Sequence, residues 1–179
     1  MSKPREPDPA KLFLSAIYRR GGAFEKCLQT LIEKFGPSDY SSRELEFTVT
    51  GYYEREMGEP LCRRFFSFRE LCDPARLAEI KLFTNELEQS SSVDDRRAVN
   101  LDPGLISMGN LILATGKPAA HRPYLGRGVY ADLTLVYESG SFKPLPWTYP
   151  DYRAPGLLDF LNRLREAYKH DLREWKDRA

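Results

Sequence analysis

Hydrophobic and polar positions follow two different periods along the first half of the chain. Residues 24–35 carry apolar side chains three or four positions apart, which predicts an amphipathic helix that Gly36 and Pro37 end. Residues 45–53 alternate between apolar and polar side chains, as a half-buried strand does. An apolar run at 11–18 predicts a more deeply buried strand.

The segments that follow extend this pattern to the order βαββαβ. Residues 61–68 predict a return strand after a charged loop at 54–60. Asp73 and Pro74 are typical of a helix start, and apolar residues at helical spacing follow them. A strand at 97–101 completes the order, which is typical of the ferredoxin-like or split-βαβ arrangement.

The second half of the chain has a different pattern. It predicts a short strand, a long alternating strand that ends in a turn, a loop rich in proline and aromatic residues, and a final amphipathic helix, at 111–114, 129–138, 144–155 and 157–175. We therefore expect an α+β fold whose ferredoxin-like first half is extended by a β-hairpin region and a C-terminal helix. We expect one mixed or antiparallel sheet, with helices packed mainly on one face. Residues 1–10 predict a flexible segment before a single domain at 11–179.

Composition and charge exclude several classes of function. The 27 basic and 26 acidic residues leave a net charge of +1, so nothing draws the whole chain to nucleic acid or to an acidic membrane. Three cysteines without C-x-x-C spacing and two distant histidines predict neither disulfides nor a metal site. The chain shows no signal peptide and no apolar run of the roughly 20 residues that a membrane span needs. We expect a cytoplasmic protein without membrane or nucleic-acid partners.

A basic loop in the second half is the first candidate for a binding site. Lys117, His121, Arg122 and Arg127 lie within eleven residues of one another, among glycines that allow close approach to a ligand. Arginine offers two parallel donors to a phosphate, and lysine offers a point charge. The alternative is a solvated basic loop between two strands.

Polar residues next to this loop could take part in chemistry. His121 could titrate near neutral pH as a catalyst or could be a structural hydrogen-bonding residue. Asp132 and Tyr130 lie on the polar face of the long strand, opposite Val129, Ala131, Leu133 and Leu135, where they line a site if that face is covered. Asn100 and Asp102 lie in the string NLDPG, for which a turn or helix cap is the favoured interpretation and ligand contact the alternative.

The loop at 145–152 is stiffened by prolines and carries large aromatic side chains. Trp147 and Tyr149 could stack on a planar ligand, or the loop could be a rigid strap that covers the core. Asp151 is expected to cap a helix. For Asp102, Asp132 and Asp151 to hold one magnesium ion, their side chains would have to converge in space.

Four strings resemble the bacterial domain of unknown function (DUF) 4416 family, many of whose members carry the label GTP-binding protein. They are NLDPG at 100–104, ATGK at 114–117, HRPYLGRGVYADLTLVY at 121–137 and LPWTYPDY at 145–152. The resemblance implies a nucleotide ligand, but the string GNLILATGKP at 109–118 is no phosphate-binding P-loop. Its glycines are too far apart, and Pro118 replaces the Ser or Thr that binds magnesium. An N-K-x-D string for guanine is also missing.

These observations predict a protein that binds a phosphate-bearing or nucleotide-like small molecule through a non-standard site within residues 100–152. Whether it catalyses a reaction, its oligomeric state and its cofactor stay open, a nucleotide with magnesium being one option. The predicted catalytic residues are His121 and Asp132. The predicted ligand contacts are Asn100, Asp102, Lys117, Arg122, Arg127, Tyr130, Trp147 and Tyr149. The alternative is a non-catalytic interaction or scaffold module. The ligand hypothesis requires the side chains of His121, Arg122 and Asp132 to converge on one concave pocket.

Overall fold

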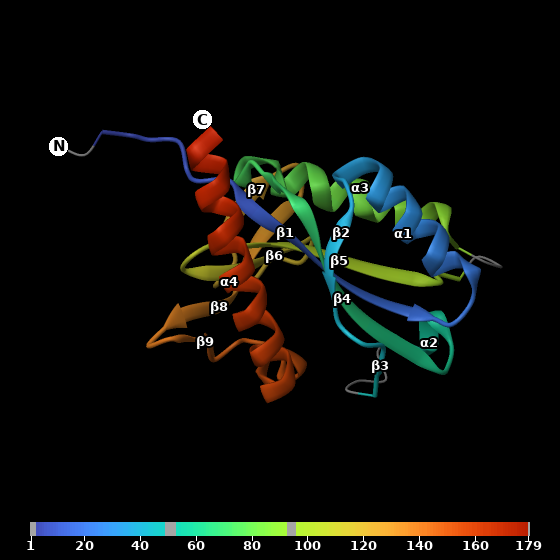
Figure 1. Ribbon diagram of the computed structural model, residues 1–179. Coiled ribbons are helices and arrows are strands. Elements are labelled where there is room, and N and C mark those ends of the chain that lie inside the picture. The colour runs from blue at the N-terminus through green and yellow to red at the C-terminus, as the bar shows by residue number, and fades with distance from the viewer. Residues whose placement is uncertain (1–2, 49–52, 93–95, 179) are drawn as a thin grey trace.

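The computed structural model describes residues 3–48, 53–92 and 96–178 (Figure 1). Within them, nine strands form one open antiparallel sheet in the order β2-β4-β1-β5-β6-β8-β7, with β3 paired to β4 and β9 to β8. The strands are β1 (Ala10–Arg19), β2 (Ser38–Ser41), β3 (Leu45–Glu46), β4 (Leu61–Cys72), β5 (Val99–Ile106), β6 (Asn110–Thr115), β7 (Tyr124–Gly126), β8 (Val129–Glu138) and β9 (Ser141–Pro144). The helices are α1 (Gly22–Phe35), α2 (Glu54–Met57), α3 (Leu77–Ser90) and α4 (Pro155–Arg178), with 3₁₀ turns η1 (Pro74–Arg76) and η2 (Pro150–Arg153).

The first half has the split-βαβ arrangement that the order of elements predicted. Strand β4 lies between β1 and β2, and β1 lies between β4 and β5, all antiparallel. The strand expected at 45–53 is the main difference, because only Leu45–Glu46 pairs there and 49–52 lie outside the described residues. Pairing at this edge falls instead to Ser38–Ser41, whose polar sequence gives no strand signal. The loop expected at 54–60 contains the helical turn α2.

The turn or helix cap favoured for Asp102 is wrong. Strand β5 runs through the whole NLDPG string to Ile106. Pro103 is tolerated there because β6 pairs with β5 only from Gly104 to Ile106, so the missing N–H of the proline breaks no ladder bond. The edge of β5 at Leu101 is completed by α3 instead. Its N–H donates to Glu88 Oε1 at 2.7 Å, and its carbonyl accepts from Lys81 Nζ at 2.9 Å.

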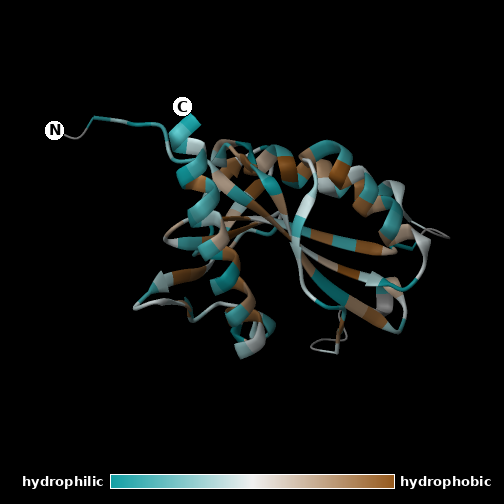
Figure 2. Ribbon diagram, viewed as in Figure 1, coloured by the Kyte–Doolittle hydropathy of each residue, from teal (hydrophilic) through white to brown (hydrophobic). Residues whose placement is uncertain are grey.

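Helices cover both faces of the sheet, whose strands carry many of the hydrophobic residues (Figure 2). Helices α1 and α3 share one face, as the expectation of helices mainly on one face requires, and α4 crosses the other (Figure 1). The core under α1 and α3 includes Leu14, Phe24, Leu31, Phe66 and Ile80. The core under α4 includes Phe13, Leu111, Leu135, Leu161 and Leu164. Among the described residues, no helix is both long and apolar enough to cross a membrane.

A fully buried lysine fixes α4 to the sheet. Lys11 Nζ lies 2.6 Å from Asp39 Oδ2 on β2 and 2.6 Å from Asp171 Oδ2 on α4. The Tyr168 hydroxyl donates to the carbonyl of Pro9 at 2.8 Å, which ties the chain just before β1 to the same helix. Because η2 leads directly into α4, these contacts also set the position of the aromatic loop.

Candidate ligand-binding site

The register of the sheet places polar side chains in neighbouring rows on the face that α4 partly covers. Ser15 of β1 lies directly opposite Asp102 of β5. Asp132 of β8 belongs to the next row, opposite Leu113, which is itself opposite Gly104. Two strand spacings and one row separate the Cα atoms of Asp102 and Asp132 by about 12 Å. One face therefore carries two polar clusters side by side.

The first cluster is centred on Asp132 and brings together three predicted residues. Arg122 donates from Nε and from one terminal nitrogen to Asp132 Oδ2, both at 2.8 Å, and from the other nitrogen to the carbonyl of Lys117 at 3.0 Å. His121 Nε2 lies 3.9 Å from the same Asp132 oxygen. That nitrogen is buried and has no hydrogen-bond partner among the described residues. These three side chains thus lie close together, but neither of the two cavities described below is lined by them.

The aromatic loop forms one wall of this cluster. The Trp147 indole stacks on the His121 ring, with centroids 4.8 Å apart and planes 18° apart. Its Nε1 donates to the carbonyl of Leu133 at 2.8 Å, and the Thr148 hydroxyl donates to the carbonyl of Thr134 at 2.5 Å. The loop is thus pinned to β8 as a rigid strap while Trp147 stays exposed, so the two interpretations of this loop are compatible.

A β-bulge explains how the strap reaches β8. Leu133 pairs with Ile112, but Leu135 pairs with Leu111, so Thr134 is an extra residue in β8. The bulge also corrects the expected alternation. Leu135 joins the core under α4, on the same side as Asp132, whereas strict alternation placed it on the opposite face. Sequence periodicity could not show this, because an inserted residue shifts every side chain after it.

The remaining predicted contacts separate into two groups. Tyr130 lies on the same face as Asp132 and contacts the Tyr124 ring at a centroid distance of 5.1 Å. Arg127 instead lies toward α3. The pKa of Glu79 on that helix is lowered mainly by Arg76, with smaller contributions from Lys34 and Arg127. Arg127 itself lies in the turn between β7 and β8, with a positive φ of 53°.

Asn100 and Asp102 belong to the second cluster. Asn100 Nδ2 donates to Asp102 Oδ2 at 2.9 Å, and Lys81 Nζ lies 3.3 Å from Oδ1. Tyr149 is 55% exposed and close enough to Tyr53 to affect the pKa of that phenol, which burial raises most. Asn100 and Asp102 thus meet at the open edge of β5.

Sequence reasoning missed the residues that complete this second cluster. Arg63 of β4 is 6% exposed, donates to Ser15 Oγ at 2.8 Å and forms an ion pair with Asp151. Its guanidinium lies 5.2 Å from the centre of the Tyr152 ring. We call Ser15, Arg63, Asn100, Asp102 and Tyr152 the polar seam. The available signal was Arg63 itself, a charge on the buried face of an apolar strand, between Leu61 and Phe65.

A family comparison adds to this geometry. The model of the domain of unknown function DUF4416 matches residues 8–168. The chain belongs to the DUF4416 family. That range contains every residue of both polar clusters. No curated protein and no solved structure matches this DUF4416 chain.

Among the described residues of the DUF4416 chain, the acids do not form a shared metal site. Within the described residues, no three His, Cys, Asp or Glu side chains are placed to hold one metal ion. Asp102, Asp132 and Asp151 thus do not converge as a single magnesium ion would require. The capping role expected for Asp151 is wrong, because Asp151 lies within η2 and Tyr149 occupies the N-cap position without a side-chain cap bond. Asp151 instead forms an ion pair with Arg63 and accepts from the N–H of Tyr152 at 3.0 Å.

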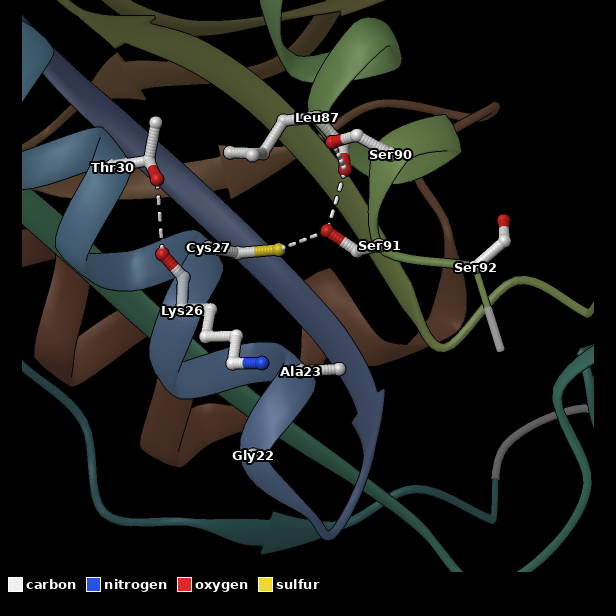
Figure 3. A pocket seen from close by; sticks show the side chains of 9 residues that line it. All are labelled: Gly22, Ala23, Lys26, Cys27, Thr30, Leu87, Ser90, Ser91 and Ser92. Atoms are coloured by element: carbon white, nitrogen blue, oxygen red, sulfur yellow. Dashed lines mark hydrogen bonds between the residues drawn. The ribbon is translucent and has the colours of Figure 1, made fainter. Parts of the chain in front are cut away.

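Two shallow cavities lie away from both clusters. One of about 460 Å³ lies between the start of α1 and the end of α3 (Figure 3). There Cys27 Sγ lies 2.8 Å from Ser91 Oγ, and burial raises the pKa of this thiol. The other, of about 360 Å³, lies beside the turn between β5 and β6. Neither is lined by residues of the polar seam, because the seam side chains fill their space with one another.

Proposed function

We propose that this DUF4416 chain is a cytoplasmic protein that binds a small molecule with a phosphate group and a planar group. The observation that carries the proposal is the buried, unpartnered Nε2 of His121, held between Asp132 and the exposed Trp147. A buried polar atom without a partner costs free energy, and such costs persist where a ligand can supply the missing partner.

The geometry gives Arg122 a different role from the one its sequence suggests. Each of its guanidinium nitrogens already has a partner, either Asp132 or the carbonyl of Lys117. Arg122 therefore orients Asp132 and closes the loop, rather than gripping a phosphate with two parallel bonds. His121 is left to contact the anionic group.

The exposed aromatic side chains supply the planar contact. One face of Trp147 is occupied by His121, so a ligand ring would stack on the other face or on Tyr149. Both contacts are independent of base identity, so the proposal includes nucleotides without requiring GTP. If the ligand has an acidic proton between His121 and Asp132, the same pair is placed to transfer it.

A thermal-shift screen tests this proposal. Inorganic phosphate, pyrophosphate, ATP and GTP are each added with and without magnesium, and a ligand at 100 times its Kd should stabilise the fold by about 2.7 kcal/mol. The variant His121→Ala should lose the shift. His170→Ala, which removes the other histidine at an exposed position on α4, should keep it. An unchanged melting temperature with all four probes would exclude the proposed ligand class.

One observation favours the alternative of an interaction module. Strand β7 is an edge of the sheet, and its Tyr124 is 62% exposed beside the exposed Leu125. An apolar sheet edge is a common site for strand addition by a partner. If this edge is the functional surface, the double variant Tyr124→Ser/Leu125→Ser should abolish partner capture in a pull-down, while His121→Ala should not.

A further inference from the structure

The outer edge of β8 is covered by several segments in turn. Strand β7 covers the first part of this edge and β9 the last part. Between the two strands, Arg122 bonds to Asp132, and Trp147 of the strap bonds to the carbonyl of Leu133. His121 precedes Arg122 in the chain and stacks on Trp147. Along this edge His121 therefore lies between β7 and Trp147.

Exposed aromatic rings lie on both sides of His121 along the edge. Trp147 is 39% exposed, and its ring covers one face of the His121 ring. Tyr124 of β7 is 62% exposed and lies against Tyr130, on the face that also carries Asp132. Tyr124 pairs with Tyr130, and Trp147 is bonded three residues further along β8, so the two attachment points are about 10 Å apart. The two rings therefore offer separate places for two planar groups.

The edge between these rings is suited to phosphate groups. Residues 115–133 contain three basic residues and one acid, Asp132, within a chain whose net charge is only +1. Arg122 neutralises that acid, so no acid of this stretch is left to repel an anion. His121 lies in the middle, and its buried Nε2 has no partner among the described residues. Phosphate groups held at His121 would lie between the two aromatic rings.

We infer that the ligand has two planar groups joined through a chain of phosphates, as a dinucleoside polyphosphate has. One planar group stacks on the free face of Trp147, the phosphates lie along the edge at His121, and the second planar group stacks on Tyr124. This inference rests on the proposed function, which requires only one planar group and a phosphate. It adds Tyr124 to the site and gives the edge strand β7 a part in ligand binding.

Isothermal titration calorimetry with diadenosine polyphosphates tests the inference. Diadenosine compounds that differ in the number of linking phosphates are each compared with the adenosine nucleotide that carries the same number. The best diadenosine compound should bind at least about tenfold more tightly than its mononucleotide. That ratio equals about 1.4 kcal/mol, which lies within the range for one base stacked on an aromatic side chain. The preference should depend on the number of phosphates, because β8 holds the two rings at a fixed spacing.

Tyrosine variants locate the second planar group. Tyr124→Ala removes an exposed ring, so the chain should still fold, and the preference for the diadenosine compound should shrink to about twofold or less. Tyr124→Phe keeps the ring, loses only the hydroxyl that accepts from the Gly128 N–H, and should keep the preference. Tyr40→Ala is the matched control. It removes a tyrosine that is 42% exposed on β2, at the opposite edge of the sheet, and should leave the preference intact.

The outcomes separate this inference from the proposed function. If ATP binds but no diadenosine compound binds more tightly than its mononucleotide, the second planar group is excluded and the phosphate ligand stands. A preference that is the same for every number of phosphates would exclude a bridge between two fixed rings. A preference that Tyr124→Ala leaves unchanged would exclude β7 as its location. If none of the nucleotides binds, both proposals fall.

Discussion

Replacing Lys11 with methionine should destabilise the fold by about 3 kcal/mol. The lysine is fully buried, and its ammonium group lies 2.6 Å from the carboxylates of both Asp39 and Asp171. Methionine keeps most of the apolar stem but leaves two negative charges facing each other without a cation. Removing one partner of a buried ion pair costs about 3–5 kcal/mol. The lower end applies because Asp171 is 29% exposed and can regain water.

Urea unfolding followed by far-UV circular dichroism measures this cost. For a chain of this length, about 3 kcal/mol corresponds to a fall of roughly 6–12 °C in Tm. Lys169→Met is the matched control. That lysine lies on the exposed side of α4 and pairs with Glu166 at 3.4 Å, so its loss should change stability by less than about 1 kcal/mol.

A second substitution shows whether the unpaired carboxylates cause the loss of stability in Lys11→Met. Asp39→Asn, added to Lys11→Met, should recover part of the loss, because only one carboxylate then faces the vacated position. Ser67, which donates to Asp39 Oδ1 at 2.6 Å, can still donate to asparagine. If Lys11→Met costs no more than Lys169→Met, or if Asp39→Asn deepens its loss, the reasoning is refuted.

Three other predictions follow from burial. Leu161→Ala, at a fully buried position under α4, should lower the free energy of unfolding by about 2–5 kcal/mol, measured in urea. Burial raises the pKa of Glu88 in the folded protein. The favourable contribution of Glu88 to folding stability is therefore complete below its ordinary pKa of about 4.3, and it is lost as the pH rises through the raised pKa. The unfolding free energy of wild type minus that of Glu88→Gln should therefore fall with rising pH, and a rise would contradict this. Burial raises the pKa values of the thiols of Cys27, Cys62 and Cys72, and that of Cys72 reaches about 11. At pH 8 these thiols should therefore react with a disulfide reagent far more slowly in the folded protein than in the protein unfolded in urea.

The sequence could predict the part of the candidate site that lies within one strand and the loop before it. His121, Arg122 and Asp132 lie close together because the loop that carries the first two returns along β8, which carries the third. Arg63 and Tyr152 were missed because they lie 89 residues apart in sequence and meet only in the folded chain.

The sequence by itself determined the order of the elements, the helical faces that enter the core and the family of the chain. Local periodicity carries that information, since each helix or strand must bury one face. Only the tertiary structure decided that β5 runs straight through Pro103, that a bulge at Thr134 lets the strap bind β8, and that Ser15, Arg63, Asp102 and Tyr152 form one seam. These features depend on pairing register between distant strands, and register is set by contacts that no local pattern contains.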